Sequence, residues 1–218
     1  MRKDPLVNGE VYHIISRSIA VYKIFTDLIS YRRTINALQF YNLPDNQIKF
    51  SKFELLSTKN QTKIIDQHQD ERLTDIISFC LMPTHFHLTL KQNTDNSISI
   101  FMNNLLNSYT RYFNTRFKRK GPLWETRFKN ILIESDEQLL HLTRYIHLNP
   151  VSAGIVENPE DWQWSSYHEY INGEEKICKY KDIINVSAHD YKKFVMDRKD
   201  YQKELSKIKA LLIDDYTG

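Results

Sequence analysis

Two histidines stand one residue apart in the apolar run LMPTHFHLTLK, residues 81–91. Side chains alternate between the two faces of a β-strand, so we expect His85 and His87 to point one way and Phe86 the other. Two imidazoles about 7 Å apart on one face of a strand can supply half of a divalent-metal site. Histidines in such a run more often simply pack or face solvent, so the pair alone leaves both interpretations open.

A tyrosine and an amide lie one helical turn apart further along the chain. Residues 135–149 are expected to form a helix, with Ser135 as its cap and with an end at Asn149, because Pro150 disfavours helical dihedrals in the residue before it. Tyr145 and Asn149 are four residues apart and therefore share one face of this helix. A phenol with a pKa of about 10 is a weak nucleophile near neutral pH, and a divalent metal can assist its attack on a phosphodiester.

Positive charge is concentrated in residues 111–130, although the whole chain carries a net charge of only +3. This stretch holds seven Lys or Arg residues and one Glu, interleaved with aromatic residues. Basic groups can neutralise phosphates and aromatic faces can stack on unpaired bases. A solvated helix end and loop, with the aromatic residues in the core, explains the same composition. The candidate DNA contacts are Arg111, Arg116, Lys118, Arg119, Lys120, Arg127 and Lys129.

The hydrophobic periodicity predicts an α+β fold with the element order β-α-β-β-α-β-α. The first six elements match a ferredoxin-like split βαββαβ antiparallel sheet with helices on one face, in which the first and third strands are central. His85 and His87 then lie in the middle of the sheet. Strands are expected at 9–17, 75–82, 85–91 and 128–133, and helices at 27–41, 96–116 and 135–149.

We expect one domain over residues 1–156 and a helical extension over residues 157–218 that packs on the domain or contacts DNA. Residues 44–73 are polar and weakly patterned, which indicates an inserted connection with a short helix near residues 53–56.

The extension contains a further helical pattern, with Ser187 or Asp190 as its expected start. Helical packing explains the pattern over residues 187–210, and a helix-turn-helix is the alternative.

The composition is that of a folded globular protein, with 41% hydrophobic and 26% charged residues. No apolar run reaches the roughly 20 residues that a membrane span needs, and the first residues lack the apolar segment of a signal peptide. The two cysteines form no pattern, which is typical of reduced thiols inside cells. We therefore expect a cytoplasmic protein.

Five blocks of this sequence together resemble the REP-associated tyrosine transposase family of single-tyrosine HUH transposases. They occur in the order and with the spacing of the family and span about half of the chain. The blocks are MPTHFHL at 82–88, SYTRYFN at 108–114, GPLWETRFK at 121–129, ESDEQLLHLTRYIHLNPVSAGIV at 134–156 and WSSYHEY at 164–170.

The resemblance implies a divalent cation, Mg²⁺ or Mn²⁺, bound by His85 and His87, with Tyr145 as the nucleophile. It implies that Asn149 completes the metal shell, where many insertion-sequence relatives have Gln. In that family the tyrosine attacks single-stranded DNA beside a hairpin, giving a 5′-phosphotyrosine and a free 3′-hydroxyl, and the reverse reaction rejoins strands. Relatives act as dimers or monomers, so a homodimer stays possible.

The sequence departs from the family pattern in two places. Arg17 is followed by residues 18–20, Ser-Ile-Ala, where the family often has Gly-Asn, which leaves the conformation of this loop open. The connection 44–73 is longer than in compact members by about twenty residues, which indicates a surface insertion.

Other side chains compete for functional roles. Tyr109 and Tyr112 are rival nucleophiles with poorer spacing to an amide. His13 is either near the site or a satisfied sheet histidine, His141 is a candidate acid–base helper, and His147 is either structural or a DNA contact.

Two other kinds of protein fit the same residues. A domesticated protein that binds structured single-stranded DNA without cutting it would share the fold and the basic stretch. A structural or hydrolytic zinc protein built on the histidine pair would need a third strong ligand nearby.

Overall fold

The structure is a computed structural model that describes residues 5–45, 48–68 and 71–199. Its four strands form one antiparallel sheet in the order β2-β3-β1-β4, which is the predicted ferredoxin-like order with β1 and β3 in the centre. The predicted fold class is therefore confirmed. The strands are β1 (Val11–Arg17), β2 (Thr74–Met82), β3 (His85–Gln92) and β4 (Lys129–Leu132).

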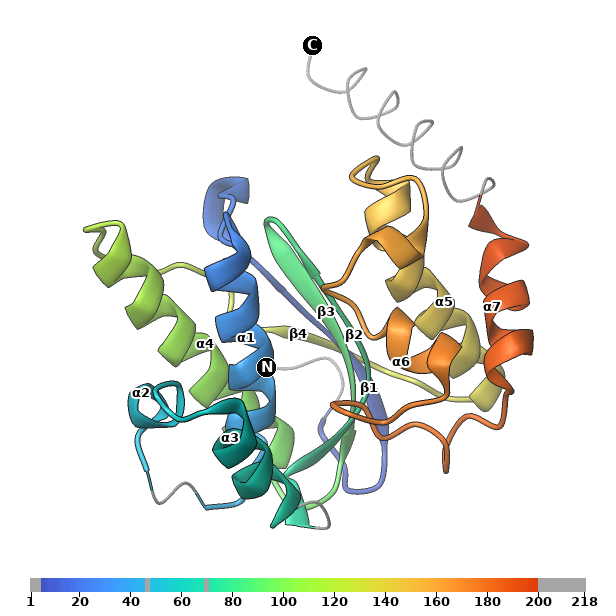
Figure 1. The fold of residues 1–218 in the computed structure, drawn as a ribbon, viewed down its shortest axis with the longest axis horizontal. Helices are drawn as coiled ribbons and strands as arrows, with labels where there is room; N and C mark the ends of the chain where they lie inside the picture. The colour runs from blue at the N-terminus through green and yellow to red at the C-terminus, as the bar shows by residue number, and fades with distance from the viewer. Residues whose placement is uncertain (1–4, 46–47, 69–70, 200–218) are drawn as a thin grey trace.

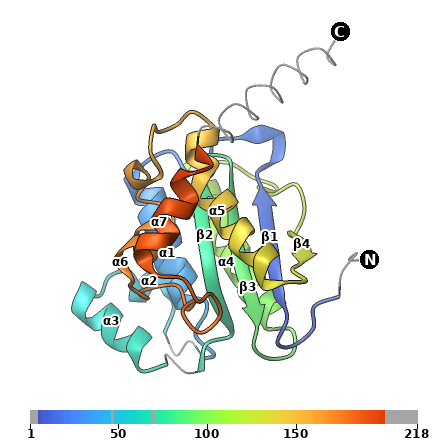
Figure 2. The same ribbon diagram turned by 90° about the vertical axis from the view of Figure 1, so that its right-hand side faces the viewer.

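The two helices of the ferredoxin-like unit, α1 (Leu28–Phe40) and α4 (Ser97–Arg116), cover one face of the sheet (Figure 1). The other face is packed by α5 (Asp136–Ser152), together with α6 (Tyr167–Asn172) and α7 (Ala188–Met196) of the extension. Figure 2 shows α6 and α7 on the β2 side of that face, with α5 running across the sheet beside them. The sheet thus separates two layers of helices.

Local capping fixes the start of α1. Asp27 accepts a hydrogen bond from the Ser30 amide at 2.9 Å, and the two residues form a capping box. Asp27 also forms an ion pair with Arg116 at the end of α4, with 2.6 Å between the nearest nitrogen and oxygen atoms. The cap therefore joins the two helices of this layer as well as starting one of them.

Helix α5 continues past Asn149 to Ser152, so the predicted end at Pro150 was wrong. A proline removes only one backbone donor, and the surrounding bonds persist. The Ala153 amide donates to the Asn149 carbonyl at 2.9 Å, and the Ile155 amide donates to the Pro150 carbonyl at 2.9 Å. Pro150 itself is buried, so tertiary packing outweighs the local preference.

The inserted connection forms two helices instead of the single short one expected near residues 53–56. They are α2 (Phe50–Phe53) and α3 (Thr58–Asp66), and they lie beside α1. Ser57 starts α3 by accepting a hydrogen bond from the Asn60 amide at 3.4 Å. The hydrophobic pattern does not predict this helix, because only Ile65 of α3 is buried.

The loop after β1, with Ser-Ile-Ala at 18–20, forms a 3₁₀ turn over Ile19–Val21. Ala20 and Val21 both adopt left-handed backbone angles, with φ of 49° and 53°. The Ser18 hydroxyl donates to the Tyr22 carbonyl at 2.6 Å and holds the turn closed.

The extension packs on the sheet domain over its described part, residues 157–199. A 3₁₀ turn (Pro159–Asp161) precedes α6, and the Leu81 amide of β2 donates to the Trp164 carbonyl at 2.9 Å. Ser187 starts α7 by accepting from the Asp190 amide at 3.1 Å, as expected. The part of the predicted helical pattern beyond residue 199 lies outside the described residues.

Both cysteines, Cys80 and Cys178, are buried free thiols. None of the helices in the described part of the chain is long and apolar enough to cross a membrane.

Candidate active site

The histidine pair lies on β3 as the alternation predicted. The His85 and His87 ring centroids are 5.0 Å apart, on the face of the sheet where His87 contacts Tyr145 of α5. Phe86 points to the opposite layer, where its ring meets Trp124 edge-on at 5.6 Å. The strand thus presents both imidazoles to one side while it anchors itself in the core on the other.

Helix α5 brings Tyr145 to this pair. Its ring meets His87 edge-on, with centroids 5.9 Å apart and an interplanar angle of 86°. The helix is held in place by Ile146, which packs with Cys80 and Met82 of the neighbouring strand β2. Tyr145 remains 44% exposed, so its hydroxyl is within reach of a substrate in solution.

A third histidine, His13 of β1, belongs to the same cluster. His13 Nε2 and His87 Nδ1 are 2.9 Å apart and share a hydrogen bond, and the two rings stack with centroids 5.1 Å apart. Because His87 uses Nδ1 in this bond, its other ring nitrogen is the one left for a metal. The sequence left open whether His13 lies near the site, because the strand register of β1 against β3 cannot be read from alternation alone.

The three imidazoles are held in their neutral form. Burial lowers the pKa of His13 to about 4. Burial, assisted by the nearby Arg17 guanidinium, lowers the pKa of His85 to about 4. Burial also lowers the pKa of His87 well below its ordinary value, with the neighbouring His13 adding to the effect. Neutral imidazoles keep the lone pairs that a metal needs at neutral pH.

The donor set around the pair fits a mixed nitrogen and oxygen metal site. His85 Nδ1 lies 3.0 Å from the Thr84 hydroxyl, which leaves the other ring nitrogen for a metal. Asn149 donates through its side-chain nitrogen to the Tyr145 carbonyl at 3.0 Å, so its side-chain oxygen is not used in that bond. Within the described residues no group of three or more His, Cys, Asp or Glu is arranged to hold a metal, and the Asn149 amide stays the predicted third ligand.

The rival tyrosines lie in the other layer of the molecule. Tyr109 of α4 is buried, and its hydroxyl donates to the Ile24 carbonyl at 2.6 Å. Burial raises the pKa of Tyr109, which disfavours the phenolate. The Tyr112 hydroxyl accepts a hydrogen bond from Arg116 at 2.7 Å. Neither ring approaches the histidine pair, because α4 packs on the opposite face of the sheet.

The two remaining histidine candidates have other partners. His147 is fully buried and bonds through its two ring nitrogens to Tyr191 and Ser166, each at 2.7 Å, so it is structural. His141 lies 2.6 Å from Arg144 and packs edge-on against Phe194 of α7.

The seven candidate DNA contacts divide between the two faces of the sheet. Lys129 pairs with Ile15 in the β1–β4 register, and Ile15 pairs with His87, so Lys129 lies on the face of the histidines. Arg111 lies on α4, in the opposite layer. Arg116 is on α4 as well, and its charge is shared with Asp27.

The basic loop between α4 and β4 runs from the α4 layer to the edge of the sheet. Arg119 braces it through hydrogen bonds to the Asn114 side chain at 3.1 Å and the Pro122 carbonyl at 2.7 Å. The Glu125 amide donates to the Arg17 carbonyl at 3.0 Å, which fixes the loop beside the end of β1. Lys118, Lys120 and Arg127 are exposed along it.

A ferredoxin-like sheet with a histidine pair on a central strand and a tyrosine on the helix packed over that strand defines the class of HUH-type tyrosine transposases. The family described as transposase, IS200-like, matches residues 10–149. The chain therefore belongs to the IS200-like transposase family.

Two relatives are REP-associated tyrosine transposases by name. One, assigned as such in Haemophilus influenzae, is 30% identical over 110 residues, which cover 46% of this chain and 62% of that protein. The alignment thus spans less than two thirds of that relative. The other, from Escherichia coli K12, is 27% identical over 143 residues, covering 62% of this chain and 81% of the relative.

A solved structure of a REP-associated tyrosine transposase bound to a REP hairpin has a similar fold. Its TM-score is 0.53 at 18% sequence identity, over 86% of this chain and 95% of that one. At this identity the likeness supports the shared fold and says nothing of individual contacts.

Proposed function

We propose that this protein is a metal-dependent single-strand DNA endonuclease and strand transferase that works through Tyr145. The observation that supports it most directly is the edge-on contact of the half-exposed Tyr145 ring with His87, at 5.9 Å between centroids. A catalytic nucleophile must be accessible and adjacent to its activating group, and the exposure of Tyr145 and its contact with a proposed metal ligand support that role.

The proposed reaction exchanges one phosphodiester bond for another, so the number of such bonds does not change. The Tyr145 oxygen, on losing its proton, attacks the phosphorus, the bond to the 3′ oxygen breaks, and that oxygen takes up a proton. The products are a 5′-phosphotyrosine and a free 3′-hydroxyl. Attack by a 3′-hydroxyl on the phosphotyrosine reverses these steps and joins strands, so no external energy source is required.

His85 and His87, with Asn149 as the amide ligand, are the residues that would hold Mg²⁺ or Mn²⁺. When bound, such a cation withdraws charge from the phosphate and favours attack by the phenolate. The protein contributes neutral imidazoles and the hydrogen bond between His13 and His87 that fixes the ring of His87.

The proposed substrate is single-stranded DNA beside a hairpin. Family membership supports a DNA substrate. The fold shared with a transposase bound to a REP hairpin favours DNA that contains a hairpin. Lys129 on the face of the histidines, and the exposed cations of the basic loop, are suited to backbone phosphates.

A covalent adduct on a denaturing gel tests the proposal. The full chain is incubated with Mn²⁺ and a hairpin DNA with single-stranded flanks, labelled at either its 5′ or its 3′ end. Only the label on the 3′ side of the cut should stay attached to the protein. Tyr145→Phe should abolish the adduct, and a chelator should do the same for the wild type.

Tyr22→Phe is the matched control, because Tyr22 is another half-exposed tyrosine, at 51% exposure. It should form the adduct at the wild-type level. An adduct that survives Tyr145→Phe, or that forms equally well with chelator, contradicts the proposal. Tight binding of the hairpin with no cleavage under any divalent metal would instead identify a non-cleaving DNA-binding protein.

A further inference from the structure

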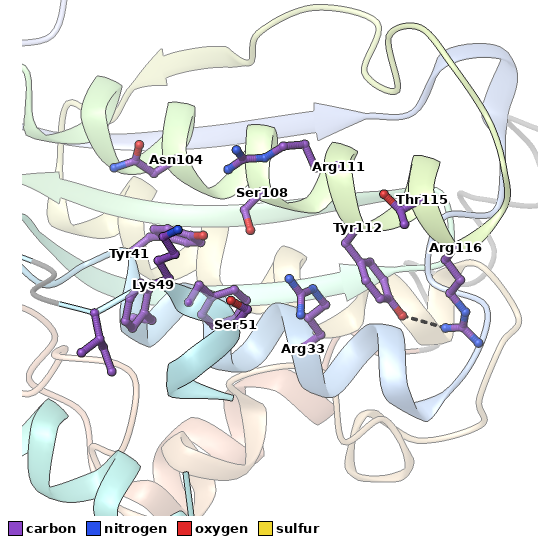
Figure 3. A pocket seen from close by; sticks show the side chains of 13 residues that line it. Arg33, Tyr41, Lys49, Ser51, Asn104, Ser108, Arg111, Tyr112, Thr115 and Arg116 are labelled. Carbon is purple, nitrogen blue, oxygen red and sulfur yellow. Dashed lines mark hydrogen bonds between the residues drawn. The ribbon is translucent and has the colours of Figure 1, made fainter. Parts of the chain in front are cut away.

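A cavity of about 870 Å³ opens in the layer of helices on the far side of the sheet from Tyr145 (Figures 1 and 3). Helix α4 forms one wall, with Ser108, Arg111 and Tyr112 among its lining residues. The other wall is made by α1 and by the inserted segment, with Arg33 and Lys49. The size falls within the range of sites that bind small molecules or single nucleotides.

The cavity is positively charged. Arg33, Lys49, Arg111 and Arg116 line it, and no Asp or Glu is among its described lining residues. Two of these cations are already paired, Arg33 with Glu54 and Arg116 with Asp27, both across the junctions of the helices. Lys49 and Arg111 are exposed, and their side chains make no hydrogen bond or ion pair with a described residue.

The floor of the cavity combines a cation with aromatic rings. The Arg33 guanidinium lies 4.7 Å from the Phe50 ring centroid and 4.6 Å from that of Tyr112. Its Nε is buried without a hydrogen-bond partner among the described residues. Arg33 therefore belongs to the floor of the cavity, and Lys49 and Arg111 are the cations that a ligand can reach.

Exposed cations beside aromatic faces and hydroxyl groups are the combination that binds single-stranded nucleic acid without reading a duplex groove. Phosphates meet the cations, and unpaired bases meet rings such as Tyr41 and Tyr112 at the cavity wall. A purely apolar ligand would leave the cations uncompensated, and a duplex is wider than a cavity of this kind.

We propose that this cavity is a second DNA site, which holds an unpaired segment of the same strand that is cut at Tyr145. The inference rests on the proposed function for its choice of ligand. The basic loop supplies the connection, because it begins at the end of α4 beside Arg116 and is fixed against Arg17 at the histidine end of β1. A DNA strand following Lys118 and Lys120 would pass from the cavity towards the histidine end of β1.

The connection between α1 and β2 supplies one wall of this site. Lys49, Phe50 and Ser51 come from it. A chain with a short connection between α1 and β2 would lack this wall. The insertion thus converts the outer surface of α4 into a bounded site.

The test measures binding and not cleavage. Fluorescence anisotropy with a labelled oligothymidylate of about twelve nucleotides compares the wild type with Lys49→Glu/Arg111→Glu. The matched control is Lys181→Glu/Lys193→Glu, an equal charge change at two exposed lysines of the extension. Circular dichroism checks that both double variants are folded.

We expect Lys49→Glu/Arg111→Glu to weaken binding at least tenfold more than the control does. We also expect the slope of log K against log salt to become shallower by about 1.4, at roughly 0.7 for each lost phosphate contact. Oligothymidylates with single 5-iodouracil substitutions should crosslink under ultraviolet light to peptides containing Tyr41 or Tyr112.

The outcomes separate this inference from the proposed function. If the wild type forms the Tyr145 adduct but the two double variants bind equally, the cavity is not a DNA site and the proposed function stands. Crosslinks confined to α5 and β3 lead to the same conclusion. If the charge reversal weakens binding selectively while no adduct forms with any metal, the cavity site stands and the nuclease assignment fails.

Discussion

At the scale of single residues, the hydrogen bond between His13 and His87 decides how the site can bind a metal. A neutral imidazole can face a metal with either nitrogen, and the bond at 2.9 Å commits Nδ1 of His87 to His13. Outer partners of this kind fix the ring orientation of a ligand and typically change metal affinity 10- to 100-fold. His13 is therefore a positioning residue in the proposed site.

The first prediction concerns this residue. His13→Gln should lower the affinity for Mn²⁺ about 10- to 100-fold, because the His87 ring loses its fixed orientation. Isothermal titration of the DNA-free protein with Mn²⁺ measures the effect without any cleavage. His189→Gln, at an exposed histidine of α7, is the control and should bind Mn²⁺ as the wild type does. Equal affinities for the two variants would exclude the positioning role.

The second prediction concerns Val21, a β-branched residue with a φ of 53° and 62% exposure. Left-handed angles are strained for such residues and free for glycine. Val21→Gly should raise the free energy of unfolding by about 1 kcal/mol, the relief of strain outweighing the greater freedom of the unfolded chain. Urea denaturation measures it, with Val7→Gly at another exposed valine as a control that should show no gain.

The family resemblance predicted His85, His87 and Tyr145 as neighbours, but not their other partners. The proximity of His13 depends on strand register, and the pairing of Arg116 with Asp27 joins residues 89 apart in the chain. Such pairings depend on how helices and strands pack, which local patterns do not encode. The roles of Asn149 and of the individual basic residues stay predictions.

At the scale of elements, the junction of α1 and α4 depends on Asp27. This carboxylate caps α1 and pairs with Arg116, and the Arg116 hydrogen bond, followed by the Ser30 amide, lowers the pKa of Asp27 to about 2. The folded state thus holds the carboxylate as an anion more strongly than the unfolded chain, where its pKa is near the ordinary 3.8. The stability due to this charge is complete above about pH 4 and is lost as the pH falls towards 2.

The third prediction separates the cap from the charge. Asp27→Ala loses both the cap and the ion pair, and the lost cap alone should cost about 1 kcal/mol of stability at pH 7. Asp27→Asn keeps a capping oxygen and should cost less. Urea denaturation at pH 7 and pH 3 measures both. The difference between wild type and Asp27→Asn should shrink at pH 3, because the carboxylate of the unfolded wild-type chain is then largely protonated while that of the folded chain is still mostly ionised. A difference independent of pH would mean that the ion pair with Arg116 does not contribute.

Elements with strong hydrophobic periodicity were predicted to within a few residues, and the two exceptions have local causes. Helix α3 was missed because a helix that buries one side chain has almost no apolar stripe to detect. The end of α5 was misplaced because burial of Pro150 and Val151 outweighs the preference of the residue before a proline.

At the scale of the molecule, the sheet separates a layer that presents the proposed chemistry from a layer that presents the proposed second DNA site. The extension stabilises the first layer. His147 of α5 is buried against Tyr191 and Ser166, both of which come from residues after 156. The Tyr170 hydroxyl also donates to the Ile77 carbonyl of β2 at 2.8 Å. Helix α5, which holds Tyr145, is thus supported on both sides.

The fourth prediction follows from this shared core. A chain that ends at Val156 should not reach a cooperative native fold, because it exposes the apolar β2 face that α6 covers and removes both hydrogen-bond partners of His147 together with the tyrosines that bury it. Urea denaturation followed by circular dichroism should show a broad, non-cooperative transition, where the full chain shows a sharp one.

Tyr191→Phe in the full chain removes a single hydrogen bond and should keep the sharp transition at a cost of about 1 kcal/mol. A cooperative 1–156 fragment that still forms the adduct would show instead that the sheet and α5 are a complete domain and that the extension serves another purpose.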